Sequence, residues 1–249
     1  MIALSVNLNK IALIRNSREG DYPSVTAFAE TCIVAGCDGI TVHPRPDQRH
    51  IRPSDVRNLS ALVARHPQLE FNIEGNPFAP PQGSYPGLMA LVEETRPHQC
   101  TLVPDSNDQL TSDHGFDLTR SGEELKPIIR DLQSWGIRVS LFMDPDPKQI
   151  QLAKVIGADR IELYTGPYAA AWNQPTLLDT LHERYRAAAQ LATEIGLGVN
   201  AGHDLNLENL TRFATIPGLL EVSIGHALTV DALLMGMDSA VRAYKALLS

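Results

Sequence analysis

The chain has 249 residues, 43% of them apolar, and its 21 basic and 29 acidic residues give a net charge of -8. This length fits one complete domain spanning residues 1–249 with a sizeable core, and no linker is needed. The net negative charge argues against sequence-independent binding to the phosphates of nucleic acids, so no nucleic acid partner is expected.

Short apolar runs alternate with segments of helical periodicity along the whole chain. The runs predict strands at 2–7, 38–43, 69–74, 99–103, 138–143, 160–165, 197–202 and 220–225. The helical segments are 23–35, 53–65, 86–96, 122–135, 147–156, 175–195, 206–213 and 229–248. Such alternation is typical of a parallel sheet covered by helices. Eight repeats predict an α/β fold, a single (β/α)8 TIM barrel with its active site at the C-terminal ends of the strands.

Histidine and arginine gather after the second expected strand. His43 ends the strand, and Arg45, Arg49 and His50 follow in one loop. Guanidinium forks match phosphate oxygens, so this loop is a candidate anion site. A solvated charged loop is the alternative, but the place of His43 directly after an apolar run favours a ring that points into the barrel mouth.

Carboxylates alternate with apolar residues in two expected strands. Glu70, Asn72 and Glu74 share one face of the strand 69–74, and Glu162 alternates in the same way in the strand 160–165. We expect these polar faces inside the barrel, where desolvation raises the pKa of a carboxyl group toward that of a general base. The spacing does not choose between Glu70 and Glu74. A structural salt bridge is the alternative for each carboxylate.

Matched Gly-His pairs end the seventh and eighth expected strands, at Gly202-His203 and Gly225-His226. The loops after these strands are a frequent phosphate site in TIM barrels, where backbone N–H groups and a helix N-terminus meet the oxygens. With the arginines of the second loop, they indicate substrates that carry two phosphates. Histidines converging with a glutamate indicate proton transfer at neutral pH.

Cysteine usage and the N-terminus indicate the compartment. Three cysteines are too few for a disulfide framework, and their odd number fits a reducing environment. The first residues lack a basic segment followed by a long apolar one, and no stretch approaches the roughly 20 apolar residues of a membrane helix. We therefore expect a cytoplasmic protein with no membrane partner.

Several motifs make the chain similar to the pyridoxine 5'-phosphate synthase family of deoxyxylulose-dependent vitamin B6 synthesis, nearly from end to end. The matching motifs are Val6-Asn7, Arg15-Asn16-Ser17-Arg18, Asp38 to His43 with Arg45 and His50, Leu69-Glu70, Ile161-Glu162, Val199 to His203 and Ile224 to Ala227. The resemblance implies a transferase-type, ring-closing enzyme. It would condense 1-deoxy-D-xylulose 5-phosphate with 3-amino-2-oxopropyl phosphate to pyridoxine 5'-phosphate, phosphate and water, with no metal or organic cofactor.

The resemblance also implies residue roles. His43 and Glu70 would be proton acceptors, which selects Glu70 over Glu74, while His203 would be the proton donor and Glu162 a transition-state stabiliser. The implied contacts of the deoxyxylulose phosphate are Arg45, His50 and Thr111. Those of the amino ketone phosphate are Asn7, Arg18, Asp204, Gly225 and His226. Family members assemble as octamers built from dimers, so the resemblance implies a homo-octamer.

The chain departs from the family pattern at three places, one of which is the segment from Asn76 to Pro86, which is longer than expected. Asn9-Lys10 stands where many members have Asp-His, and Asp204 stands where glycine is common. Two rival functions remain: a metal-dependent barrel hydrolase or isomerase with ligands His43, Glu70, Asp144 and His203, and a non-catalytic barrel that binds a phosphorylated metabolite. The number of acid-base residues exceeds what phosphate binding needs, which favours the synthase.

Overall fold

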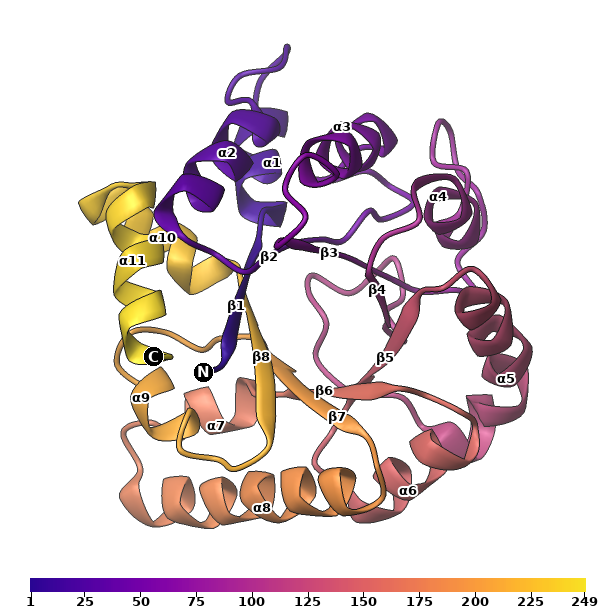
Figure 1. Cartoon of the computed structure of the whole chain (residues 1–249), viewed down its shortest axis with the longest axis vertical. Coiled ribbons are helices and arrows are strands. Elements are labelled where there is room, and N and C mark those ends of the chain that lie inside the picture. The colour runs from indigo at the N-terminus through magenta and orange to yellow at the C-terminus, as the bar shows by residue number, and fades with distance from the viewer.

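The computed structural model describes all 249 residues, and its centre is a closed barrel of eight parallel strands that follow one another in sequence order (Figure 1). The strands are β1 (Ala3–Asn7), β2 (Gly39–Val42), β3 (Glu70–Gly75), β4 (Gln99–Leu102), β5 (Arg138–Met143), β6 (Arg160–Tyr164), β7 (Gly198–Gly202) and β8 (Leu219–Ile224). This confirms the predicted TIM barrel, and every strand begins and ends within one residue of its prediction.

Eleven helices surround the barrel (Figure 1). They are α1 (Asn9–Asn16), α2 (Val25–Ala35), α3 (Pro53–Val63), α4 (Leu88–Thr95), α5 (Leu118–Ser134), α6 (Pro147–Val155), α7 (Gly166–Ala170), α8 (Pro175–Glu194), α9 (Leu210–Phe213), α10 (His226–Met235) and α11 (Met237–Leu247). None of them combines the length and the apolar character needed to cross a membrane.

The helices differ from the prediction in four respects, one of which is that α9 begins at Leu210, four residues later than expected. The short helices α1 and α7 are additional, and the expected helix 229–248 is two helices that Gly236 separates with a φ of +84°. Helix α5 begins four residues earlier than expected, because the side chain of Asp117 accepts a hydrogen bond from the Thr119 N–H and caps it. The helix then continues through Pro127.

The inside of the barrel is polar and its outside is apolar, as the alternation in the strand 69–74 predicts. Outward-facing strand residues such as Val6, Ile73 and Leu163 are fully buried in the core that packs against the helices. The inward residues bond across the barrel: Asn200 Nδ2 on β7 donates to Gln99 Oε1 on β4 at 3.3 Å. These two strands are not neighbours, so the bond passes through the interior.

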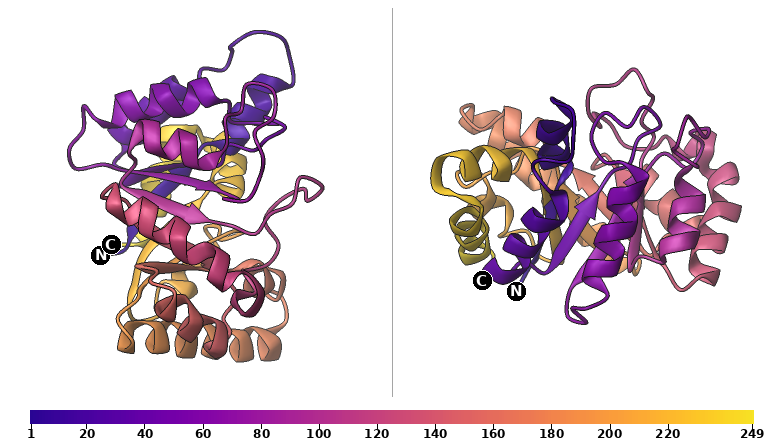
Figure 2. Two further views of the ribbon diagram at one scale, coloured as in Figure 1. Left: turned by 90° about the vertical axis from the view of Figure 1, so that its right-hand side faces the viewer. Right: turned by 90° about the horizontal axis from the view of Figure 1, so that it is seen from above.

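The two ends of the barrel carry different groups. At the strand starts, ion pairs join Arg138 to Glu70 and, at 3.6 Å, Arg160 to Glu221. Both pairs link strands that are not neighbours, so they cross the N-terminal end of the interior. Long loops extend from the opposite end, while the two chain termini lie close together at the strand-start end (Figure 2).

Candidate active site

A pocket of about 330 Å³ opens at the C-terminal ends of the strands. Its volume falls within the range of small-molecule sites. Ten of the twelve site residues expected from the sequence line it: Asn7, His43, Arg45, His50, Thr111, Glu162, His203, Asp204, Gly225 and His226. The two exceptions are Glu70 and Arg18.

Glu70, which the resemblance selects over Glu74, lies at the strand-start end of the barrel and does not line the pocket. It is the first residue of β3, and both of its carboxylate oxygens accept hydrogen bonds from Arg138. Four residues further along the strand, about 13 Å at 3.3 Å per residue, Glu74 lines the pocket. Because Ile73 pairs with Val42, Glu74 is level with His43. Arg18 is exposed on the segment after α1 and does not line the pocket.

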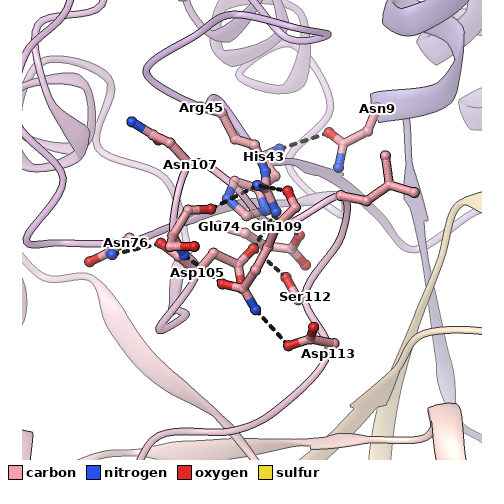
Figure 3. A network of polar contacts seen from close by, with 12 residues as sticks. Asn9, His43, Arg45, Glu74, Asn76, Asp105, Asn107, Gln109, Ser112 and Asp113 are labelled. Carbon is pink, nitrogen blue, oxygen red and sulfur yellow. Dashed lines mark hydrogen bonds and ion pairs between the residues drawn. The ribbon is translucent and has the colours of Figure 1, made fainter.

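His43 and Glu74 form the buried centre of the pocket. His43 Nδ1 lies 3.9 Å from Glu74 Oε2, and the side chains are 7% and 5% exposed. Asn7 Nδ2 donates to the same Glu74 oxygen at 3.3 Å, and the Asn9 side-chain oxygen accepts from the His43 backbone N–H at 2.9 Å (Figure 3). The side-chain amides at the end of β1 and the start of α1 therefore fix both groups.

Burial sets the protonation states of this pair. It raises the pKa of Glu74 to about 8, helped by the nearby Asp105 carboxylate, and it lowers the pKa of His43 well below 6.5, helped by the positive charge of Arg45. At neutral pH a neutral imidazole thus faces a carboxyl group that readily gains and loses a proton. That combination suits general acid-base catalysis.

Glu162 projects from β6 into the same interior and is 1% exposed. Its Oε2 atom has no hydrogen-bond partner, and burial together with the Glu74 carboxylate raises its pKa well above 4.5. Gly202 makes room for it, because a Cβ atom at that position would lie 2.3 Å from Glu162 Oε1. The glycine of the first Gly-His pair is therefore needed for the carboxyl group, a role that the sequence does not reveal.

His203 is held at the mouth by unusual backbone and by aromatic rings. Its φ is +77° and that of Asp204 is +59°, both in the left-handed region that few side chains favour. The His203 ring packs edge-on against Phe142 at 5.0 Å and Tyr164 at 5.8 Å between ring centroids, and the Thr165 hydroxyl donates to the His203 carbonyl. Sequence reasoning missed Phe142 and Tyr164, although both stand at inward positions of their strands.

Two of the arginines in the loop after β2 hold another loop. Arg45 donates to the buried Asp105 carboxylate and to the Gln109 carbonyl at 3.0 Å (Figure 3). Arg49 donates to the same carbonyl at 2.8 Å. Ser112 Oγ donates to Asp105 at 2.6 Å. These bonds hold the segment 105–112 against the pocket, with Thr111 in its lining.

His50 is an oriented hydrogen-bond donor. Its Nδ1 accepts from the Ile51 backbone N–H at 2.9 Å, so the proton of the neutral ring resides on Nε2. Burial, with the charges of Arg45 and Arg49, lowers the pKa of His50 to about 3. The ring is therefore neutral at physiological pH, and it lies edge-on to His43 with 6.2 Å between the ring centroids.

The residues of the metal hydrolase alternative do not come together. Glu70 is at the far end of the barrel, and Asp144 belongs to a separate cleft of about 420 Å³ between the 114–117 segment and α8. No group of three or more histidine, cysteine, aspartate or glutamate side chains is arranged to hold a metal ion. The second cleft contains none of the acid-base residues that converge in the barrel mouth.

Solved structures with the same architecture are distant in sequence. The tryptophan synthase alpha chain from Legionella pneumophila superposes with a TM-score of 0.66 at 14% identity, covering 100% of this chain and 91% of that one. The 3-hexulose-6-phosphate synthase from Salmonella typhimurium gives 0.64 at 17% identity, covering 99% and 98%. At such identities the likeness shows the fold alone.

Sequence comparisons are far more specific. A pyridoxine 5'-phosphate synthase of Xanthomonas axonopodis pv. citri is 58% identical over 242 residues, covering 97% of this chain and 94% of that protein. One of Xylella fastidiosa is 55% identical over 242 residues, covering 97% and 92%. The family model described as pyridoxal phosphate biosynthesis protein PdxJ matches residues 4–249. The chain therefore belongs to the PdxJ family of pyridoxal phosphate biosynthesis proteins.

Proposed function

We propose that this chain is a pyridoxine 5'-phosphate synthase, which condenses 1-deoxy-D-xylulose 5-phosphate with 3-amino-2-oxopropyl phosphate. The observation that carries the proposal is the convergence of His43, Glu74, Glu162 and His203 in one pocket. Joining an amine to a ketone and then forming an aromatic ring requires several proton abstractions from carbon and several dehydrations. Four acid-base groups around one cavity fit that demand, whereas capture of a phosphate ester does not need them.

In this proposal His43 and Glu74 accept protons, and Glu74 takes the role that the resemblance implies for Glu70. The neutral His43 ring has a free nitrogen that can accept a proton. The pKa of about 8 leaves a fraction of Glu74 ionised near neutral pH, and this is the form that accepts a proton. His203 donates a proton at the pocket mouth. Glu162, whose buried Oε2 atom has no partner in the chain, stabilises the transition state through a hydrogen bond.

Two anion sites position the substrates. The N-terminus of α10, with Gly225 and His226 in the pocket lining, presents backbone N–H groups to the phosphate of the amino ketone. Asn7 and Asp204 lie beside it and can contact the amino group. The phosphate of the deoxyxylulose substrate lies on the side of His50, Arg45 and Thr111. Arg18 has no role in this arrangement.

The test is incubation of the purified protein with both phosphorylated ketones while following the absorbance of the pyridoxine ring. Omission of either ketone serves as the control and should abolish the signal. Formation of pyridoxine 5'-phosphate only when both are present supports the proposal. Binding of both ketones by calorimetry without product would instead favour the non-catalytic phosphometabolite-binding barrel.

We further propose that the chain assembles as a homo-octamer, as the resemblance implies, and works in the cytoplasm. Exposed apolar side chains on the contacting helices α1 and α10 support association; they are Leu13, Ile14, Leu233 and Leu234. The three cysteines are unpaired, which supports a reducing compartment. Light scattering should give eight times the 27.2 kDa of one chain, and a monomer mass would contradict the assembly.

A further inference from the structure

Lys10 is a positive charge at the pocket without a partner in the structure. It is the second residue of α1, it is half-buried, and it lines the pocket beside Asn9. No hydrogen bond or ion pair of the chain involves its ammonium group. A half-buried ammonium gives up part of its hydration, so an unsatisfied one in a cavity wall is a candidate ligand contact.

The other cationic side chains of the pocket are already engaged. Arg45 is paired with Asp105, and Arg49 with Asp47 at 2.7 Å. The three buried imidazoles add no charge, because burial lowers the pKa of each of them. Lys10 is therefore the one lysine or arginine of the pocket lining whose charge is free to balance an incoming anion.

We infer that Lys10 binds the phosphoryl group of 1-deoxy-D-xylulose 5-phosphate, together with the His50 Nε2–H and the Thr111 hydroxyl. This inference rests on the proposed function. It gives a substrate role to a residue that differs from the Asp-His pair common in the family.

Three observations favour this phosphate over that of the amino ketone. The charge of Lys10 contributes to the lowered pKa of both His50 and His203, so the ammonium lies near both rings. His50 directs its Nε2–H away from Ile51, because Nδ1 is occupied. The other phosphate has the N–H groups of α10 for its own site and needs no side-chain cation.

The charge balance explains why a cation is needed there. Burial keeps Glu74 protonated at neutral pH and raises the pKa of Glu162, so neither carboxyl group requires a counter-charge. A phosphomonoester brings about two negative charges into a partly desolvated cavity. A charge-assisted hydrogen bond from an ammonium group offsets part of that cost.

The test compares Lys10→Met, Lys10→Arg and the control Lys148→Met. Lys148 is an exposed residue of α6 outside the pocket, so its loss removes the same charge without touching the site. We expect K10M to raise the KM for the deoxyxylulose phosphate about tenfold to a hundredfold, while the KM for the amino ketone phosphate and kcat change little. K10R should recover most of the loss, and K148M should behave as the unchanged protein.

A second readout separates binding from a merely structural role. Loss of the Lys10 charge should raise the pKa of His203, measured by the NMR titration of its ring proton, while Asp204, Asp105 and Arg45 continue to act on the ring. An unchanged KM for the deoxyxylulose phosphate in K10M, or a rise confined to the amino ketone phosphate, would overturn the inference.

Direct binding distinguishes this inference from the proposed function. Calorimetry with 1-deoxy-D-xylulose 5-phosphate alone needs no turnover. Weaker binding to K10M than to K148M, in a protein that forms no product, would refute the synthase but uphold the Lys10 site. Equal binding to both variants, in a protein that forms product, would refute the Lys10 site alone.

Discussion

Two single variants of β3, each of which replaces a glutamate carboxyl group by an amide, test which glutamate is the base. Glu74→Gln keeps the shape of the side chain and removes its ability to accept a proton, so we expect turnover to fall about 100-fold to 10,000-fold. Glu70→Gln acts at the opposite end of the barrel and should leave turnover unchanged. Its ion pair with Arg138 is 43% exposed on the glutamate side, which limits the loss of stability to about 1 kcal/mol.

The two variants should also differ in how their free energy of unfolding depends on pH. The pKa of Glu74 is about 8 in the folded chain and near 4.5 in the unfolded chain, so the folded state binds the proton more tightly. The stability linked to Glu74 is complete below pH 4.5 and is lost as the pH rises through 8. The loss amounts to about 5 kcal/mol at most. E74Q has no such group, so its stability should decline less than that of the unchanged protein across this window.

The assays are steady-state synthesis of pyridoxine 5'-phosphate and urea unfolding at pH 5 and pH 8. E70Q is the matched control, because it carries the same chemical change on the same face of the same strand. Full turnover by E74Q with loss of turnover in E70Q would refute the placement of the base at the pocket. A parallel decline of stability in E74Q and the unchanged protein would refute the burial argument for its pKa.

Three further changes test other parts of the site. Gly202→Ala brings a Cβ to 2.3 Å from Glu162 Oε1. We therefore expect thermal unfolding to show a loss of about 1–3 kcal/mol in stability, together with a lower kcat. Normal stability and normal kcat would mean that the carboxyl group is not confined there. Arg49→Ala removes bonds to the 105–112 loop, and limited proteolysis should cut that loop faster than in the unchanged protein. The His50 ring proton should show no NMR titration between pH 5 and 8, because its pKa is about 3; the stability linked to it is complete above pH 6.5 and falls as the pH drops toward 3.

The strands were predictable from sequence because each is a short run rich in apolar residues between two helical segments, and in β3 and β6 apolar residues also alternate with polar ones. The short helices were not. Helix α1 follows β1 after Leu8 alone and has no side-chain cap, and α7 begins with Gly166-Pro167, a pair that also favours turns. Such elements are stabilised by tertiary contacts rather than by local signals.

The alternation of polar and apolar residues shows which face of a strand a residue occupies, but not how far along the barrel axis it lies. Glu70 and Glu74 share a face, and only the pairing of Gly39 with Glu70 shows that Glu70 is level with the start of β2. The ion pair of Arg45 could not be predicted from the sequence either, since its partner Asp105 is 60 residues away. The sequence therefore predicted which residue types meet at the mouth, while register and long-range pairing determine which of them meet there.

The division of the barrel into a polar inside and an apolar outside separates two kinds of evolutionary constraint. Folding energy comes from the ring of aliphatic contacts between strands and helices, whereas the inward positions are bound mainly by hydrogen bonds to one another. Inward residues such as Thr101 and Asn72 can then be exchanged by selection, or by an engineer, without disturbing the hydrophobic packing outside the barrel. New chemistry in this scaffold should be sought by remodelling the lumen and leaving the outer ring intact.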